Sequence, residues 1–174
     1  MLIQHIPTRL TDGAVRETFL FADLCGFTEY TCRYGDKPAA DLAVGFHRRV
    51  RELAADEGCN VVKSIGDAVM VHSHDCRIAV RLAWRILALS EAYGYPPIRI
   101  GIDSGPAVRR EGDWYGSTVN AAARVADVAT PGELLMTERV RSAVEDGLSI
   151  RVIPRGIRDL KGLPAAPVHA AVSA

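Results

Sequence analysis

The sequence predicts an α+β fold built on a ferredoxin-like β-α-β-β-α-β palm, with strands and helices appended at the C-terminal end. Three observations lead to this prediction. A short apolar strand precedes a long amphipathic helix, two β-rich runs flank a Gly-Asp pair, and a second amphipathic helix precedes another strand. In such an arrangement the first strand lies beside the hairpin in the sheet.

The first strand and the first helix have clear signals. Residues 18–22 form an apolar run that ends at Asp23. Over residues 37–57 the apolar side chains recur at helical spacing, and arginine and glutamate fill the other face. Gly58 follows directly, which is typical of the end of a helix.

The hairpin and the second helix come next. Residues 60–65 and 68–72 predict two strands joined at Gly66-Asp67, which places an aspartate at the tip of the hairpin. Asp75 is a suitable cap for a helix that runs to about residue 93. A row of arginines lies on its outer face, where we expect solvent contact: Arg77, Arg81 and Arg85.

Shorter signals predict the appended elements. After the strand at 98–102, which completes the palm, they are a helix at 117–128, a strand at 134–136, a helix at 138–145 and strands at 150–171 around a turn at 161–162. We therefore assign residues 17–174 to one domain and leave residues 1–16 without a predicted element.

Composition excludes several classes of protein. With 174 residues and 48% hydrophobic residues, the chain is long enough for one well-packed domain. The 21 basic residues balance the 21 acidic ones, which argues against nucleic-acid binding through bulk positive charge. No apolar run approaches the roughly 18 residues of a membrane-spanning helix, and the polar N-terminus does not fit a signal peptide. We expect a cytoplasmic protein with no membrane insertion and no nucleic-acid partner.

Cysteine and histidine spacing gives no metal or disulfide motif. The four cysteines are scattered without a CxxC pair: Cys25, Cys32, Cys59 and Cys76. Cys25 has no histidine nearby in the sequence to activate it as a nucleophile. His72 and His74 alternate as they would at a strand end, and the predicted interpretation is that they are surface or half-buried side chains.

Asp23 and Asp67 are predicted to be neighbours, because one ends the first strand and the other lies at the hairpin tip. Paired carboxylates either share a proton or bind divalent cations. A glycine-containing turn follows Asp23 and leads into a helix N-terminus, whose free N–H groups suit a polyphosphate. The alternative is purely structural: Asp23 caps the turn and Asp67 fills a hairpin.

Three segments resemble the class III nucleotidyl cyclases. They are FADLCGFT at 21–28, VKSIGDAVM at 62–70 and GSTVNAAAR at 116–124, and with DWYG at 113–116 they resemble actinobacterial adenylate cyclase domains. The resemblance implies that Asp23, Asp67 and the carbonyl oxygen of Leu24 bind two Mg²⁺ or Mn²⁺ ions per active site. One ion would activate the ribose 3′-hydroxyl for in-line attack, and the other would stabilise the pyrophosphate.

The same resemblance assigns roles to further residues. Lys63 and Asp113 match the pair that recognises adenine, while Asn120 and Arg124 match the pair that orients the ribose and neutralises the α-phosphate. The triphosphate contacts implied are those of the glycine-containing turn and the tail: Cys25, Gly26, Phe27, Thr28 and Lys161.

The resemblance implies an adenylate cyclase that converts ATP to 3′,5′-cyclic AMP and pyrophosphate, with active sites shared across a homodimer. Three alternatives stay open at this point. They are a guanylate or pyrimidine nucleotide cyclase, a nucleotide-binding regulatory module without turnover, and a diguanylate cyclase or polymerase palm. The last would show a Gly-Gly-Asp-Glu-Phe-like turn, whereas this chain has Ser-Ile-Gly-Asp-Ala.

Overall fold

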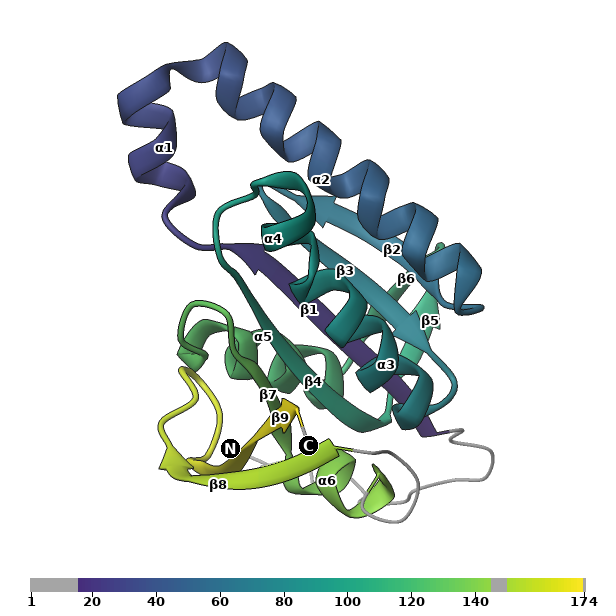
Figure 1. The fold of residues 1–174 in the computed structure, drawn as a ribbon. Helices are drawn as coiled ribbons and strands as arrows, with labels where there is room; N and C mark the ends of the chain where they lie inside the picture. Colours follow the sequence, from purple (N-terminus) through teal and green to yellow (C-terminus); the bar gives the residue numbers. More distant parts are fainter. Residues whose placement is uncertain (1–15, 145–149, 174) are drawn as a thin grey trace, which may run out of the picture.

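The computed structural model describes residues 16–144 and 150–173 and contains one mixed seven-stranded sheet. Its strands are β1 (Arg16–Leu24), β2 (Asn60–Ile65), β3 (Ala68–Ser73), β4 (Ile98–Pro106), β7 (Leu134–Thr137), β8 (Ile150–Arg158) and β9 (Ala166–Ser173). They are ordered β2-β3-β1-β4-β7-β9-β8 (Figure 1). Only β4 and β7 pair in parallel among the described strands.

Helices cover both faces of this sheet. They are α1 (Phe27–Tyr34), α2 (Asp36–Asp56), α3 (Cys76–Leu87), α4 (Leu89–Tyr93), α5 (Ser117–Val128) and α6 (Glu138–Val144). α2 and α3 lie along one face and α5 along the other (Figure 1). Across the described ranges, none of these helices has the length and apolar character needed to cross a membrane.

The ferredoxin-like prediction is confirmed. β1, β2, β3 and β4 lie in the order β2-β3-β1-β4, so β1 sits beside the hairpin as expected. β1 pairs antiparallel with β3 on one side, with Ala22 opposite Val69, and with β4 on the other, with Asp23 opposite Arg99. The tip of the hairpin and the end of β1 therefore meet at one edge of the palm.

Apolar side chains fill both sides of the sheet. The larger cluster packs β1, β3 and β4 against α2, α3 and α6, with Phe46 and Ile86 fully buried. On the opposite face α5 lies very close to β4, since a Cβ on Gly101 would be 2.1 Å from the amide nitrogen of Ala126. Glycine at position 101 is therefore required for α5 to pack against β4.

The structure corrects three details of the expected elements. The single helix expected at 75–93 is two helices, because a turn at Ala88 separates α3 from α4. The backbone at Ala88 has a ψ of −16°, which is tighter than in an α-helix. α1 gave no apolar pattern because none of its residues is buried. The segment 108–115 folds as a short hairpin of β5 (Val108–Arg110) and β6 (Asp113–Tyr115), whose three-residue strands are too short for a periodic signal.

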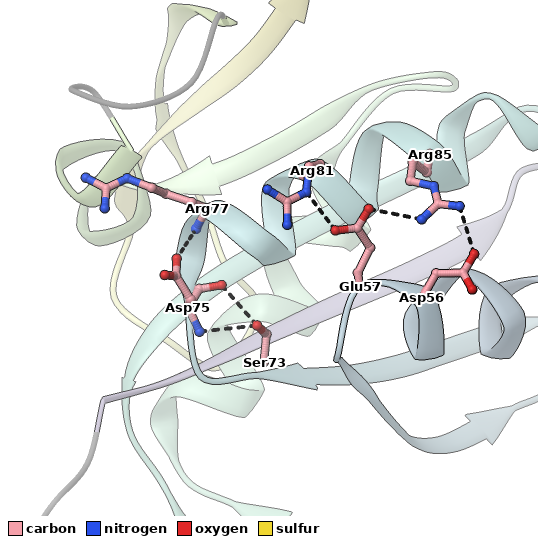
Figure 2. A network of polar contacts seen from close by, with 7 residues as sticks. All are labelled: Asp56, Glu57, Ser73, Asp75, Arg77, Arg81 and Arg85. Carbon is pink, nitrogen blue, oxygen red and sulfur yellow. Dashed lines mark hydrogen bonds and ion pairs between the residues drawn. The ribbon is translucent and has the colours of Figure 1, made fainter.

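The arginine row on α3 contacts solvent, as expected, since Arg77 and Arg81 are exposed and the Arg85 side chain is 38% exposed, but two of its members also form ion pairs. Arg81 donates to Glu57 at 2.6 Å, and Arg85 donates to both Glu57 and Asp56 at 3.0 Å (Figure 2). These bonds fasten α3 to the end of α2. The sequence could not show this contact, because the partners are 24 to 29 residues apart.

We expect Glu57→Gln to lower the free energy of unfolding by about 1 kcal/mol at neutral pH, since exposed ion pairs are each worth roughly 0.2–1 kcal/mol. The hydrogen bond from Arg81 holds the pKa of Glu57 below its ordinary value of 4.5. The contribution of these ion pairs to the free energy of unfolding is therefore fully present above pH 4.5, and it disappears as the pH falls through the lower pKa of Glu57 in the native state. Urea denaturation at several pH values measures it. Glu52→Gln breaks a single exposed pair within α2 and should cost less.

Candidate active site

Asp23 and Asp67 meet at the edge of the palm, as the sequence predicts. Asp23 lies near the end of β1, and Asp67 lies in the turn between β2 and β3. The two carboxyl groups are close enough for the charge of Asp23 to contribute to the raised pKa of Asp67. Two carboxylates this close cannot both be ionised at low cost without a positive partner. The arrangement fits a divalent cation, whose preferred ligands are carboxylate and carbonyl oxygens.

The charges around this pair are unbalanced toward the negative. Burial, together with the charge of Asp23, raises the pKa of Asp67 from 3.8 to about 6. Arg99 donates to Oδ2 of Asp23 from Nε at 2.8 Å and from a terminal nitrogen at 2.5 Å. Without a cation, the pair therefore retains a proton at mildly acidic pH, and Arg99 compensates only Asp23.

Arg99 is a residue that the sequence reading missed. It lies on β4 directly opposite Asp23 in the antiparallel pairing, and the two residues are 76 positions apart. It also donates to the backbone carbonyl of Asp127, near the end of α5. A register between strands this far apart leaves no local pattern, so the only available signal was a strand predicted at 98–102, which begins near the same edge.

A helix N-terminus follows the carboxylates directly. Gly26 adopts a positive φ of 73° and precedes α1, at whose start no side chain caps the first amides. The amide of Cys25 already donates to the carbonyl of Pro97 at 2.8 Å. Burial raises the pKa of the Cys25 thiol, so it is protonated at neutral pH and unsuited to act as a nucleophile. The amides of Gly26, Phe27 and Thr28 are in position for an anion.

Lys63 and Asp113 form an ion pair of 2.5 Å, although they lie 50 residues apart. Lys63 belongs to β2, just after an irregularity in its pairing with β3, and Asp113 begins β6. The hydrogen bond from Lys63, with a second from the amide of Trp114, holds the pKa of Asp113 below its ordinary range. A donor and an acceptor thus stand side by side at a half-exposed surface, as recognition of a base requires.

Asn120 and Arg124 lie one helical turn apart on α5. Asn120 is exposed, and Arg124 donates to Asp127 at 2.8 Å. Lys161 is exposed in the loop between β8 and β9, and its neighbour Leu160 packs in a cluster with Val125 of α5. The structure thereby brings Lys161 to the C-terminal half of the helix that carries Arg124.

The sequence matches a known family and several known proteins. The family model for the adenylate and guanylate cyclase catalytic domain matches residues 14–170. The chain is 39% identical over 138 residues to a pH-sensitive adenylate cyclase of Mycobacterium tuberculosis, and 34% identical over 117 residues to an adenylate cyclase of Streptomyces griseus. These matches cover 77% and 67% of this chain but 34% and 29% of the relatives, so it spans about a third of their length.

Solved structures share the fold. The adenylyl cyclase CyaB of P. aeruginosa superposes with a TM-score of 0.79 at 22% identity, covering 91% of this chain and 94% of that one. The guanylate cyclase domain of RhGC from Catenaria anguillulae, in complex with GTP, gives 0.82 at 21% identity, covering 92% and 97%.

Proposed function

Because the chain belongs to the family of adenylate and guanylate cyclase catalytic domains, we propose that it converts ATP to 3′,5′-cyclic AMP and pyrophosphate. The observation that carries the proposal is the carboxylate pair of Asp23 and Asp67 beside the uncapped N-terminus of α1. An acidic pair can lie next to amides that bind an anion when a cation lies between the carboxylates and that anion, because the like charges would otherwise repel each other.

In this proposal Asp23, Asp67 and the carbonyl oxygen of Leu24 hold two divalent ions, Mg²⁺ or Mn²⁺. The support is chemical: the donors are all oxygens, and the raised pKa of Asp67 marks a site with an excess of negative charge, which suits a cation. Bound there, the ions would lower the pKa of the ribose 3′-hydroxyl and stabilise the departing pyrophosphate. Arg99 orients the Asp23 carboxylate for binding through its two hydrogen bonds.

The polyphosphate is bound, in this proposal, by main-chain and side-chain donors. The amides of Gly26, Phe27 and Thr28 face it at the start of α1, where the helix dipole favours negative charge. Lys161 adds a positive charge from the β8–β9 loop. Cys25 contributes through the backbone of the turn between β1 and α1, because its own amide already donates a hydrogen bond to the carbonyl of Pro97.

Lys63 and Asp113 select adenine. The lysine donates to N1, and the aspartate accepts from the exocyclic N6 amine. Guanine presents a protonated N1 and an oxygen in place of that amine, so both contacts would face the wrong partner. Each mismatch costs about 1–3 kcal/mol when the groups are desolvated. The 2.5 Å pair between the two side chains supports a single joint role.

Arg124 and Asn120 complete the site. The guanidinium stays charged and offers several donors in one plane, which suits the charge that develops on the α-phosphate oxygens. The Asn120 amide orients the ribose. Arg124 must first exchange Asp127 for the phosphate, and its 41% exposed side chain permits that movement.

The active site is formed between two copies of the chain. One supplies Asp23 and Asp67, and the other supplies Lys63, Asp113, Asn120 and Arg124. Exposed apolar side chains lie near the base-recognising pair: Ile65 at the end of β2, and Val108 and Tyr115 on the β5–β6 hairpin, each at least half exposed. Such a surface is typical of a protein–protein interface.

Product analysis tests the proposal. The protein is incubated separately with ATP, GTP, CTP and UTP, each with Mg²⁺ and with Mn²⁺, and the nucleotides are separated chromatographically. We expect metal-dependent cyclic AMP to dominate. Cyclic GMP or a cyclic pyrimidine nucleotide as the main product would contradict the roles of Lys63 and Asp113. A folded, dimeric protein that binds ATP without forming a cyclic product would instead be a regulatory module.

A further inference from the structure

A second group of metal-ligating side chains lies at the other end of β1. Glu17 is near the start of this strand, and His72 is on β3 with His74 just beyond it. Phe19 pairs directly with His72. Because side chains two positions apart share a face of a strand, Glu17 lies on the same face as His72, and His74 follows on that face.

The ligand atoms of the three side chains converge. Oε2 of Glu17 lies 2.5 Å from Nε2 of His72 and 2.9 Å from Nδ1 of His74, and all three atoms lie within 4.8 Å of one another. The side chains of Glu17 and His72 are only 8% and 4% exposed, whereas His74 is 70% exposed. Two ligands are thus fixed by the core, and the third faces solvent.

We propose that Glu17, His72 and His74 bind one late first-row divalent cation of the Zn²⁺ class. Two imidazole nitrogens and one carboxylate oxygen, with a fourth position open, are a recognised donor set for such ions, whereas Mg²⁺ prefers oxygens alone. Both histidines line a cavity of about 370 Å³, which has room for a water molecule as the fourth ligand. A metal would also compensate the buried carboxylate of Glu17.

Binding requires a small movement. Metal–ligand distances of about 2.0–2.1 Å in a tetrahedral site separate the ligand atoms by about 3.3 Å. The carboxylate must therefore move away from each imidazole by less than about 1 Å, and the two imidazole nitrogens, which lie within 4.8 Å of each other, must approach by up to about 1.5 Å. The exposed His74 ring can supply most of this displacement.

This site is distinct from the proposed ion-binding pair of Asp23 and Asp67, although its cavity borders the base-recognising pair through Val62, Gly112 and Trp114. Glu17 and Asp23 are near opposite ends of β1, about 20 Å apart for a strand that rises roughly 3.3 Å per residue. The two sites also differ in chemistry, since the Asp23–Asp67 site offers only oxygen ligands, whereas this one offers two nitrogens and one oxygen. The His72 ring stacks on the indole of Trp114, with 4.6 Å between the ring centroids and an angle of 21° between the ring planes. A bound ion would therefore immobilise the ring that supports the residue next to Asp113.

The test is titration of the purified full chain with Zn²⁺ against a chromophoric chelator, without nucleotide. We expect one tight equivalent that persists in the double variant Asp23→Asn/Asp67→Asn. His74→Ala should weaken it by about tenfold or more, because even the loss of an outer-shell partner costs 10–100-fold. Cys32→Ala, which removes an exposed thiol elsewhere, is the matched control. Co²⁺ should give the intense visible absorption of a four-coordinate site in the wild type.

His74 is exposed, so its substitution should not disturb folding; Glu17→Gln, checked by circular dichroism, provides the second variant. Zn²⁺ affinity unchanged by His74→Ala would overturn the proposal. So would the absence of a tight equivalent in the wild type, which would mean that the three side chains form only a hydrogen-bonded cluster. Zn²⁺ binding lost in the Asp23/Asp67 variant and retained in His74→Ala would place the ion at the nucleotide site.

Discussion

Asp67→Asn is expected to reduce cyclic AMP formation by about a thousandfold or more. A bound metal contributes several kcal/mol to the transition state, and about 1.4 kcal/mol is a factor of ten in rate. The amide preserves the size of the side chain and its place in the β2–β3 turn but removes the charge that binds the ions. Initial rates with saturating Mg²⁺ or Mn²⁺ measure the effect. Asp41→Asn, on the exposed face of α2, is the control and should leave the rate unchanged.

The same variant should be more stable than the wild type in the absence of metal at neutral pH. Burial and the neighbouring Asp23 raise the pKa of Asp67 to about 6. The native state therefore binds more protons than the unfolded chain between pH 3.8 and about 6, and stability falls as the pH rises through that range. The neutral amide of the variant does not ionise and carries no such cost. Thermal denaturation in EDTA at pH 5 and pH 8 should show the advantage of the variant growing with pH.

A variant that loses activity and also loses stability would contradict this account, because it would indicate a structural role for Asp67. The opposing directions of the two effects separate the functional from the structural interpretation. Added Mg²⁺ should stabilise the wild type more than the variant, since ligand binding to the native state raises the free energy of unfolding.

Local patterns were sufficient to predict the palm and the Asp23–Asp67 contact. Helical periodicity, a glycine helix end and a Gly-Asp hairpin turn are each contained in a few residues, and connection rules then leave few possible topologies. Asp23 and Asp67 follow from the ends of those elements. The roles of Asn120, Arg124 and Lys63 came from resemblance, because an isolated polar residue on a helix or strand carries no chemical meaning of its own.

Contacts that depend on register between distant segments could not be predicted. The Asp23–Arg99 pair requires knowing that β1 and β4 are aligned residue by residue. The strand predicted from residue 18 actually begins at Arg16, and this extension places Glu17 in the sheet beside the histidines. The expectation that both histidines are surface or half-buried side chains is wrong for His72, which is buried, because residues 72 and 74 alone showed only the alternation of a strand end.

Mixing two inactive variants should restore activity if the site is shared between protomers. In the proposed site, Asp23→Ala removes a metal ligand from one half, and Arg124→Ala removes the phosphate-binding guanidinium from the other half. With equal amounts and random exchange, half of the dimers are mixed, and each has one intact site of two, so we expect about a quarter of the wild-type rate. Subunit exchange is verified by differently tagged chains.

A second mixture makes the experiment decisive. Asp23→Ala and Asp67→Ala both damage the half-site that binds the ions, so each site of a mixed dimer keeps one defect and no activity should return. Recovery only in the first mixture requires that Asp23 and Arg124 act from different chains. If exchange is complete and both mixtures stay inactive, each active site lies within one protomer. In that case the two copies associate without sharing catalytic residues.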